Sequence, residues 1–189
     1  GTSAFIGLSL SGVFFHNTGI LTRAIATTDI VSHPHDFFNK HQKPLIISFA
    51  RSGNSPESCA AVALADKLSK KCFHFIITCD ETGALAQCDS SNPTYVFVLP
   101  QSANDKSLAM TGSYSGMLLT GLLMAYINQK QKIKQQVELL MKAAENIFSY
   151  HLPALKKIAE KDFKRAFFLG SGSLFGTATE AALKLQELT

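Results

Sequence analysis

The chain alternates short apolar runs, rich in residues that favour strands, with segments of helical periodicity. This alternation is typical of a parallel sheet with crossover helices. Four runs predict buried strands, at residues 44–49, 73–78, 95–99 and 165–169. Helices are expected over residues 56–68, 84–87, 107–127, 133–150 and 174–188. The predicted fold class is therefore α/β with a mostly parallel sheet.

Two distant stretches share a short pattern. Residues 1–7 and 170–176 each contain a Gly/Ser-rich turn, then an aromatic residue, then glycine. The similarity predicts an internal duplication. Residues 1–130 would form a first domain that lacks its first strand, and residues 131–189 the connecting helices and the start of a second. A turn at the beginning and an uncapped helix at the end lead us to expect a chain cut at both ends.

Composition and charge exclude several classes of protein. At 189 residues, with 46% apolar and 17% charged residues, the chain can bury a core without disulfides or metals. The net charge of +4 is spread thinly, and the lysine-rich stretch 130–134 lacks aromatic residues and arginine. We therefore expect no nucleic-acid partner. The most apolar stretch, residues 117–127, is much shorter than a membrane span, so no membrane partner is expected.

The cysteines and histidines give no sign of a metal site. No C-x-x-C pair occurs, and histidines and carboxylates do not cluster at the spacing of metal ligands. We therefore expect reduced thiols in a cytoplasmic protein, with no metal and no organic cofactor. The cysteines are Cys59, Cys72, Cys79 and Cys88.

Ser-rich turns are the most informative local feature. One turn contains Thr2 and Ser3, and the other, after the strand at 44–49, contains Ser52, Asn54 and Ser55. In open α/β sheets, ligands bind at the carboxyl ends of strands, where the next helix presents free N–H groups and a partial positive charge. Either turn alone could hold only helix-capping residues. Two such turns, spaced by one βαβ repeat, favour a phosphate site.

The last predicted helix carries three charged residues on one face. Glu180 and Lys184 are four positions apart, and Lys184 and Glu187 three. Spacing alone favours the ordinary interpretation, in which these residues form a solvated ion-pair face.

Longer stretches resemble one family. Residues 46–57, which contain Arg51-Ser52-Gly53-Asn54-Ser55, resemble the Ser-x-Ser-Gly-x-Thr phosphate motif of the SIS (sugar isomerase) family. Residues 168–187 are similar to the second-copy motif of the isomerase half of glucosamine-6-phosphate synthase. Residues 1–7, 23–29 and 48–58 are similar to the group of tagatose-6-phosphate ketose/aldose isomerases, some of whose members are galactosamine-6-phosphate deaminases. The resemblance implies a three-layer, flavodoxin-like α/β sandwich and a partial double-SIS chain.

The resemblance also implies roles for particular residues. Ser3, Ser52 and Ser55 match phosphate ligands, with Thr2 and Asn54 close by. Where the synthase has Ser-Gln, this chain has Ala50-Arg51. The Arg51 guanidinium could pair with the phosphate or point to solvent, and the sequence leaves both open.

The catalytic roles come from the last helix. Glu187 matches the family's enolising base, and Lys184 matches a lysine that lines the same pocket. None of the six histidines matches the family's ring-opening histidine, which lies beyond Thr189 in the motif. We therefore expect an isomerase or deaminase that acts on a hexose 6-phosphate or 2-amino-hexose 6-phosphate by enediol proton transfer. A non-catalytic sugar-phosphate-binding SIS module is the alternative. Members of the family typically form dimers or larger oligomers, so the resemblance also implies a homo-oligomer.

Overall fold

The computed structural model describes residues 1–188. Its helices are α1 (Thr2–Thr18), α2 (Thr27–Ser32), α3 (Pro56–Leu68), α4 (Gly112–Ala125), α5 (Lys130–Asn146), α6 (Leu152–Ala159) and α7 (Leu174–Leu188). The strands are β1 (Leu45–Ala50), β2 (Phe73–Thr78) and β3 (Thr94–Val98). Short 3-10 turns occupy Pro34–Asp36, Gln101–Ala103 and Ile127–Gln129, and a π-helical turn, η4 (Ile147–His151), joins α5 to α6.

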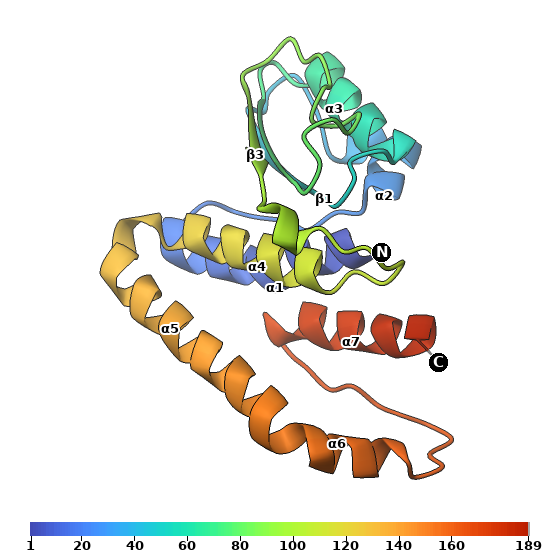
Figure 1. The fold of residues 1–189 in the computed structure, drawn as a ribbon. Coiled ribbons are helices and arrows are strands. Elements are labelled where there is room, and N and C mark those ends of the chain that lie inside the picture. The colour runs from blue at the N-terminus through green and yellow to red at the C-terminus, as the bar shows by residue number, and fades with distance from the viewer. Residues whose placement is uncertain (189) are drawn as a thin grey trace.

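The sheet is parallel, with strand order β1-β2-β3. Ile76 and Ile77 of β2 are fully buried on opposite faces, because successive strand residues alternate in direction. Ile77 packs with apolar residues of α1 and α4, and Ile76 packs with residues of α3 and the turn that follows β2. Helices therefore cover both faces of the sheet (Figure 1), which confirms the α/β sandwich.

Three predicted elements differ in the structure. Residues 165–169 form no strand, because no strand of the described chain lies beside them to complete a hydrogen-bond ladder, and Leu169 is 92% exposed. Residues 84–87 form turns and no helix, because the amides of Ala84 and Leu85 donate to the 53–54 turn instead. Helix α4 begins at Gly112, later than expected, because the Asp105 carboxylate accepts the first N–H groups of the helix.

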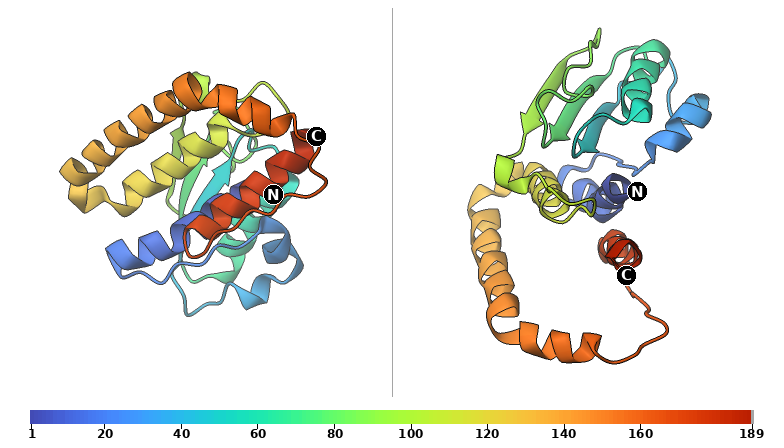
Figure 2. Two further views of the ribbon diagram at one scale, coloured as in Figure 1. Left: turned by 90° about the horizontal axis from the view of Figure 1, so that it is seen from below. Right: turned by 45° about the vertical axis from the view of Figure 1, so that its right-hand side comes forward.

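Helices α5 and α6 form an arm that extends away from the sheet and returns through residues 160–173 to α7 (Figures 1 and 2). The sequence predicts an amphipathic helix here, and the helix is confirmed. Its apolar face is exposed in the described chain: Leu140 is 58% exposed and Phe148 is 70% exposed. The chain stays helical through the π-helical turn into α6, because Pro153 falls in the first turn of α6, where a proline is tolerated.

The first and last helices lie side by side, as Figures 1 and 2 show. Gly176 of α7 makes this approach possible. A Cβ atom there would lie 2.7 Å from the backbone nitrogen of Ser9 and closer still to the Phe5 carbonyl oxygen and the Ser9 hydroxyl. The contact brings two ends of the sequence into one place.

Candidate functional site

A polar cluster lies where the first turn of α1 meets α7. Thr2 Oγ1 donates a hydrogen bond to Glu180 Oε1 over 3.2 Å. Lys184 Nζ donates to the same hydroxyl over 3.3 Å and lies 3.3 Å from Glu180 Oε1. Lys184 also pairs with Glu187 Oε2. The structure therefore joins Thr2, Lys184 and Glu187 directly, three residues that the sequence assigns to the site, and adds Glu180.

Glu180 is the residue that sequence reasoning left out of the site. The interpretation as a solvated ion-pair face is wrong for Glu180, because this residue is only 4% exposed and accepts a hydrogen bond from Thr2 of another helix. Its Oε2 atom is buried and has no hydrogen-bond partner within residues 1–188. The signal that could have found it is the four-residue spacing to Lys184, which places both side chains on the face that meets α1.

Burial and charge set the protonation of this cluster. Burial raises the pKa of Glu180 above its ordinary value, against the lowering effect of Lys184 and Thr2. Burial alone would lower the pKa of Lys184, but the hydrogen bond to Glu187 and the charge of Glu180 outweigh it and raise that pKa. Lys184 is therefore a firmly charged ammonium.

Exposure distinguishes the two carboxylates of the cluster. The Glu187 side chain is 31% exposed and the Glu180 side chain only 5%. Glu187 is the carboxylate that a molecule from solvent can reach. The cluster thus offers an accessible carboxylate beside a fixed cation, which together can move a proton and stabilise the negative charge that develops.

The Ser-rich turn after β1 is held by the turn after β2. Gly53 adopts φ +68°, a left-handed conformation that suits glycine. Its carbonyl oxygen accepts the Leu85 N–H over 2.9 Å, and the Asn54 Oδ1 atom accepts the Ala84 N–H over 3.0 Å. Asn54 is thus a brace between two turns, at the end of the sheet where parallel strands terminate.

The sequence predicts a turn at residues 1–3, but Thr2 and Ser3 lie in the first turn of α1. Among the described residues, the hydroxyls of Ser3 and Ser55 make no hydrogen bond. Ser52 and Ser55 are exposed and Ser3 is half-buried. Ser55 occupies the N-cap position of α3, as expected, yet its hydroxyl makes no capping hydrogen bond. Ser52 Oγ accepts the Asn54 N–H over 3.4 Å. Within residues 1–188, no hydrogen bond joins Ser3 to Ser52 or Ser55, so the structure does not bring these three hydroxyls into direct contact.

The Arg51 side chain bonds to backbone carbonyl oxygens that lie outside its own turn. Its Nη1 atom donates to the carbonyl oxygens of Ser107 over 2.9 Å and Leu108 over 3.3 Å. The Arg51 carbonyl oxygen in turn accepts from Cys79 N and from Thr78 Oγ1. The residue therefore ties the turn after β1 to the segment that leads into α4.

Comparison with known proteins gives a consistent set of relatives. The chain is 42% identical, over its whole length, to the D-galactosamine-6-phosphate deaminase AgaS of Shewanella sp. (strain ANA-3), of which it covers 49%. It is 37% identical to the D-galactosamine-6-phosphate deaminase AgaS of Escherichia coli, again over the whole chain and 49% of the relative. The chain thus spans about half the length of the curated relatives that it matches. No protein-family model matches it.

Solved structures agree with the sequence comparison. A Clostridium novyi NT protein assigned as a tagatose-6-phosphate ketose/aldose isomerase superposes with a TM-score of 0.96 and 43% identity, over 100% of this chain and 48% of that one. The tagatose-6-phosphate ketose/aldose isomerase of Escherichia coli gives a TM-score of 0.81 and 38% identity, over 100% of this chain and 52% of that one. Among the described residues, no helix combines the length and the apolarity needed to cross a membrane.

Proposed function

This chain is a homologue of the AgaS galactosamine-6-phosphate deaminases and of the tagatose-6-phosphate ketose/aldose isomerases and has the phosphosugar isomerase (SIS) fold, and we propose that it carries the proton-transfer site of such an enzyme. The observation that carries the proposal is the contact between Thr2, Lys184 and Glu187 across two helices. A solvated ion pair would not need a buried carboxylate, Glu180, beneath it.

In the proposed mechanism, Glu187 moves a proton between C1 and C2 of the open-chain sugar. The reaction passes through an enediol or enolamine, whose oxygen gains negative charge as the proton leaves carbon. The Lys184 ammonium stabilises that charge, and its raised pKa keeps it protonated at neutral pH. Glu180 and Thr2 act as positioning residues, because both bond to Lys184. Phosphate binding, remote from the reacting carbons, supplies orientation.

Deamination needs one further step. In a 2-amino sugar, removal of the C2 proton and reprotonation at C1 leave a C2 imine. Water adds to C2 to give a carbinolamine. The amino group takes up the proton of the new hydroxyl, the C–N bond breaks, and ammonia leaves, so that a ketose phosphate remains. Isomerase and deaminase therefore share the same acid–base residues.

For the phosphate we propose Ser3, Ser52 and Ser55 as ligands, with Thr2 and Asn54 adjoining. The free hydroxyls of Ser3 and Ser55 and the exposed Ser52 support this assignment. Replacing Ser55 by alanine should weaken the binding of a sugar phosphate about 10-fold or more, since a hydrogen bond to a charged group is lost. Binding of the same sugar without phosphate should not change. Ser32→Ala, at an exposed serine of α2, is the matched control.

The organisation of the chain follows the same proposal. We assign residues 1–130 to a first SIS domain and residues 131–189 to connecting helices and the start of a second. The α1–α7 contact supports this division, because the two similar stretches, residues 1–7 and 170–176, both lie where one of these helices begins. We further propose a cytoplasmic homo-oligomer, supported by four free cysteine thiols and by the exposed apolar face of α5.

The deciding experiment measures ammonium release by the full-length protein from galactosamine 6-phosphate, with glucosamine 6-phosphate as comparison. Release that falls about 10²- to 10⁴-fold in Glu187→Gln supports a deaminase with Glu187 as base. Glu138→Gln, at an exposed carboxylate of α5, should keep wild-type turnover. Wild-type turnover in Glu187→Gln would contradict the assignment.

The same assay separates the alternatives. Conversion of tagatose 6-phosphate without ammonium release from either amino sugar would identify a ketose/aldose isomerase. Tight sugar-phosphate binding without any turnover would identify a sugar-phosphate-binding regulatory module.

A further inference from the structure

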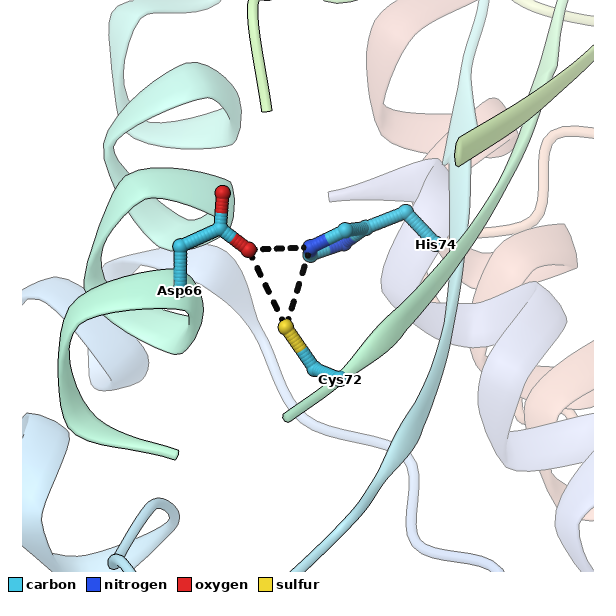
Figure 3. A group of neighbouring side chains, drawn as sticks. All are labelled: Asp66, Cys72 and His74. Atoms are coloured by element: carbon cyan, nitrogen blue, oxygen red, sulfur yellow. Dashed lines mark hydrogen bonds and ion pairs between the residues drawn. The ribbon is translucent and has the colours of Figure 1, made fainter. Parts of the chain in front are cut away.

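A second polar cluster lies at the opposite end of the sheet from the Ser-rich turn. Cys72 directly precedes β2 and His74 is its second residue, so their side chains point to the same face. Both reach Asp66 in the last turn of α3 (Figure 3). Asp66 Oδ1 lies 2.8 Å from His74 Nε2 and 3.0 Å from Cys72 Sγ, and Cys72 Sγ lies 3.3 Å from His74 Nε2. One sulfur, one imidazole nitrogen and one carboxylate oxygen therefore form a compact triangle.

The triangle is buried and supported from outside. Cys72 is 0% exposed and His74 is 2% exposed. Ser90 Oγ donates to the second carboxylate oxygen of Asp66 over 2.7 Å, and Asn92 Nδ2 donates to the first over 2.9 Å. Asn92 also fixes the backbone of Cys72, because its Oδ1 atom accepts the Cys72 N–H over 3.3 Å. Two residues that bind no metal themselves thus hold the donors in place, as outer partners do at metal sites.

We propose that Asp66, Cys72 and His74 form a binding site for a thiophilic divalent metal ion, with Zn²⁺ as the ion that fits best. Thiolate, imidazole and carboxylate are the three donors that Zn²⁺ takes in proteins. Around a tetrahedral Zn²⁺ with bonds of roughly 2.0–2.3 Å, neighbouring donors lie about 3.3–3.6 Å apart. The observed separations are shorter by a few tenths of an ångström, so small side-chain movements admit the ion.

Proton balance follows from the present hydrogen bonds. Cys72 Sγ donates a hydrogen bond to Asp66 Oδ1, so the metal-free thiol carries its proton. On binding, that proton leaves to solvent and a metal–sulfur bond forms. In the metal-free protein His74 Nε2 carries the ring proton and donates it to Asp66 Oδ1. On metal binding the Nε2 lone pair makes the second bond, and the ring proton moves by exchange with solvent to Nδ1, which is buried and has no hydrogen-bond partner in the part of the chain described. Asp66 makes the third bond, and a water molecule or another small ligand completes the set.

We expect a metal ion at this site to stabilise the fold, not to take part in the sugar reaction. It joins α3, β2 and the segment that enters β3, whose Pro93 carbonyl oxygen accepts the His74 N–H over 3.0 Å. The serines proposed for phosphate follow the carboxyl end of β1, whereas this cluster lies at the amino end of β2. With three protein donors and an unpartnered Nδ1, we expect weaker binding than at zinc sites with four protein ligands.

Cobalt titration of the chain tests the proposal directly. The untagged protein, stripped with a chelator and kept reduced, is titrated with Co²⁺ alone. We expect one Co²⁺ per chain, with an intense near-ultraviolet thiolate-to-cobalt band and visible bands of tetrahedral Co²⁺. Co²⁺ binding to the metal-free protein should release about one proton per ion at neutral pH, and Zn²⁺ should then displace the Co²⁺ without further proton release.

Variants decide whether these three residues are the ligands. Cys72→Ser should abolish the thiolate band, and Asp66→Asn should weaken binding at least about 10-fold. Cys59→Ser and His41→Ala, which change a cysteine and an exposed histidine outside the cluster, should bind Co²⁺ like the wild type. Zn²⁺ should raise the melting temperature of the wild type and of these two controls, but not that of Asp66→Asn. Absence of a thiolate band in the wild type, or equal binding by folded Cys72→Ser, would show that the cluster is only a hydrogen-bond network.

Discussion

Lys184 Nζ lies 3.3 Å from the hydroxyl of Thr2, so a side chain of the last helix meets one in the first turn of the first helix. Thr2 is 6% exposed, and its hydroxyl donates a hydrogen bond to Glu180. This buried hydroxyl sets the direction of both charged side chains. Its contacts suggest a direct test of the site.

Thr2→Val keeps the shape of the side chain and removes the hydroxyl. Lys184 and Glu180 would lose a shared partner, and a hydrogen bond to a charged group is worth roughly 1.5–3 kcal/mol. We therefore expect kcat/KM of the full-length protein to fall about 10- to 100-fold. Thr2→Ser keeps the hydroxyl and should remain close to the wild type. Equal steady-state rates for Thr2→Val and wild type would remove Thr2 from the mechanism.

Arg51→Gln should loosen the segment before α4. The change removes the donors to the carbonyl oxygens of Ser107 and Leu108. Limited trypsin digestion should then cut after Lys106 several-fold faster than in the wild type, and Lys106→Gln should abolish that cut. We expect sugar-phosphate affinity to change less than threefold, because the guanidinium is already engaged. Affinity lowered more than 10-fold, with the cut unchanged, would instead identify Arg51 as a phosphate ligand.

Gly176→Ala should separate α7 from α1. The added methyl group would clash with the Phe5 carbonyl oxygen and with Ser9, and overpacking of this kind costs about 1–3 kcal/mol. Gly12→Ala is the matched control on α1, because a Cβ atom there meets nothing within 4 Å. It should stabilise the helix by up to about 1 kcal/mol. If urea melts showed both variants to be more stable, or both to be less stable, than the wild type, that result would contradict the packing.

Asp105→Ala should remove the cap of α4. The carboxylate accepts hydrogen bonds from the N–H groups of Thr111, Gly112 and Ser113 over 2.8–3.0 Å. It also accepts hydrogen bonds from the hydroxyls of Thr111 and Ser113. We expect a loss of about 1–3 kcal/mol in the free energy of unfolding at pH 7. Asp162→Ala, which breaks an exposed ion pair with Lys164, should cost at most about 1 kcal/mol.

The cost of Asp105→Ala should also depend on pH. Burial would raise the pKa of Asp105, but the hydrogen bonds from Ser113, Thr111 and Gly112 outweigh it and lower that pKa below 3.8. A lowered folded-state pKa means that the stabilisation is complete above the unfolded value and disappears as pH falls through the folded one. The difference between wild type and variant, measured by denaturant melts, should therefore shrink steadily below about pH 4. A difference that is constant from pH 7 down to acid would show that the charge is irrelevant.

Local patterns predicted much of this fold because local physics determines it. Residues 73–78 and 174–188 form the expected strand and helix with the same bounds, since apolar content and periodicity decide them. The run at 165–169 has strand composition but no pairing strand among residues 1–188, and composition does not reveal whether a neighbouring strand is present. Asp105 starts α4 from a position outside the helix, which propensity does not encode.

The site shows the same division. Lys184 and Glu187 were predicted from the family resemblance, and the structure places them side by side. The burial of Glu180, by contrast, depends on how closely α1 approaches α7 at Gly176. The cluster of Asp66, Cys72 and His74 escaped notice for a related reason. Cys72 lies six positions after Asp66, and the two side chains meet only because β2 folds back beside α3.

The pairing of Thr2 with Lys184 joins residues that are 182 positions apart. During synthesis the ribosome releases the sheet and its covering helices long before α7 appears, so the β1–β2–β3 layer has time to form on its own. The cluster of Thr2, Glu180, Lys184 and Glu187 cannot exist in that intermediate, because its three charged residues all belong to α7. Within residues 1–188, the contact between α1 and α7 can therefore form only after the rest of the described chain has been made, and closing so long a loop costs more chain entropy than forming a local contact.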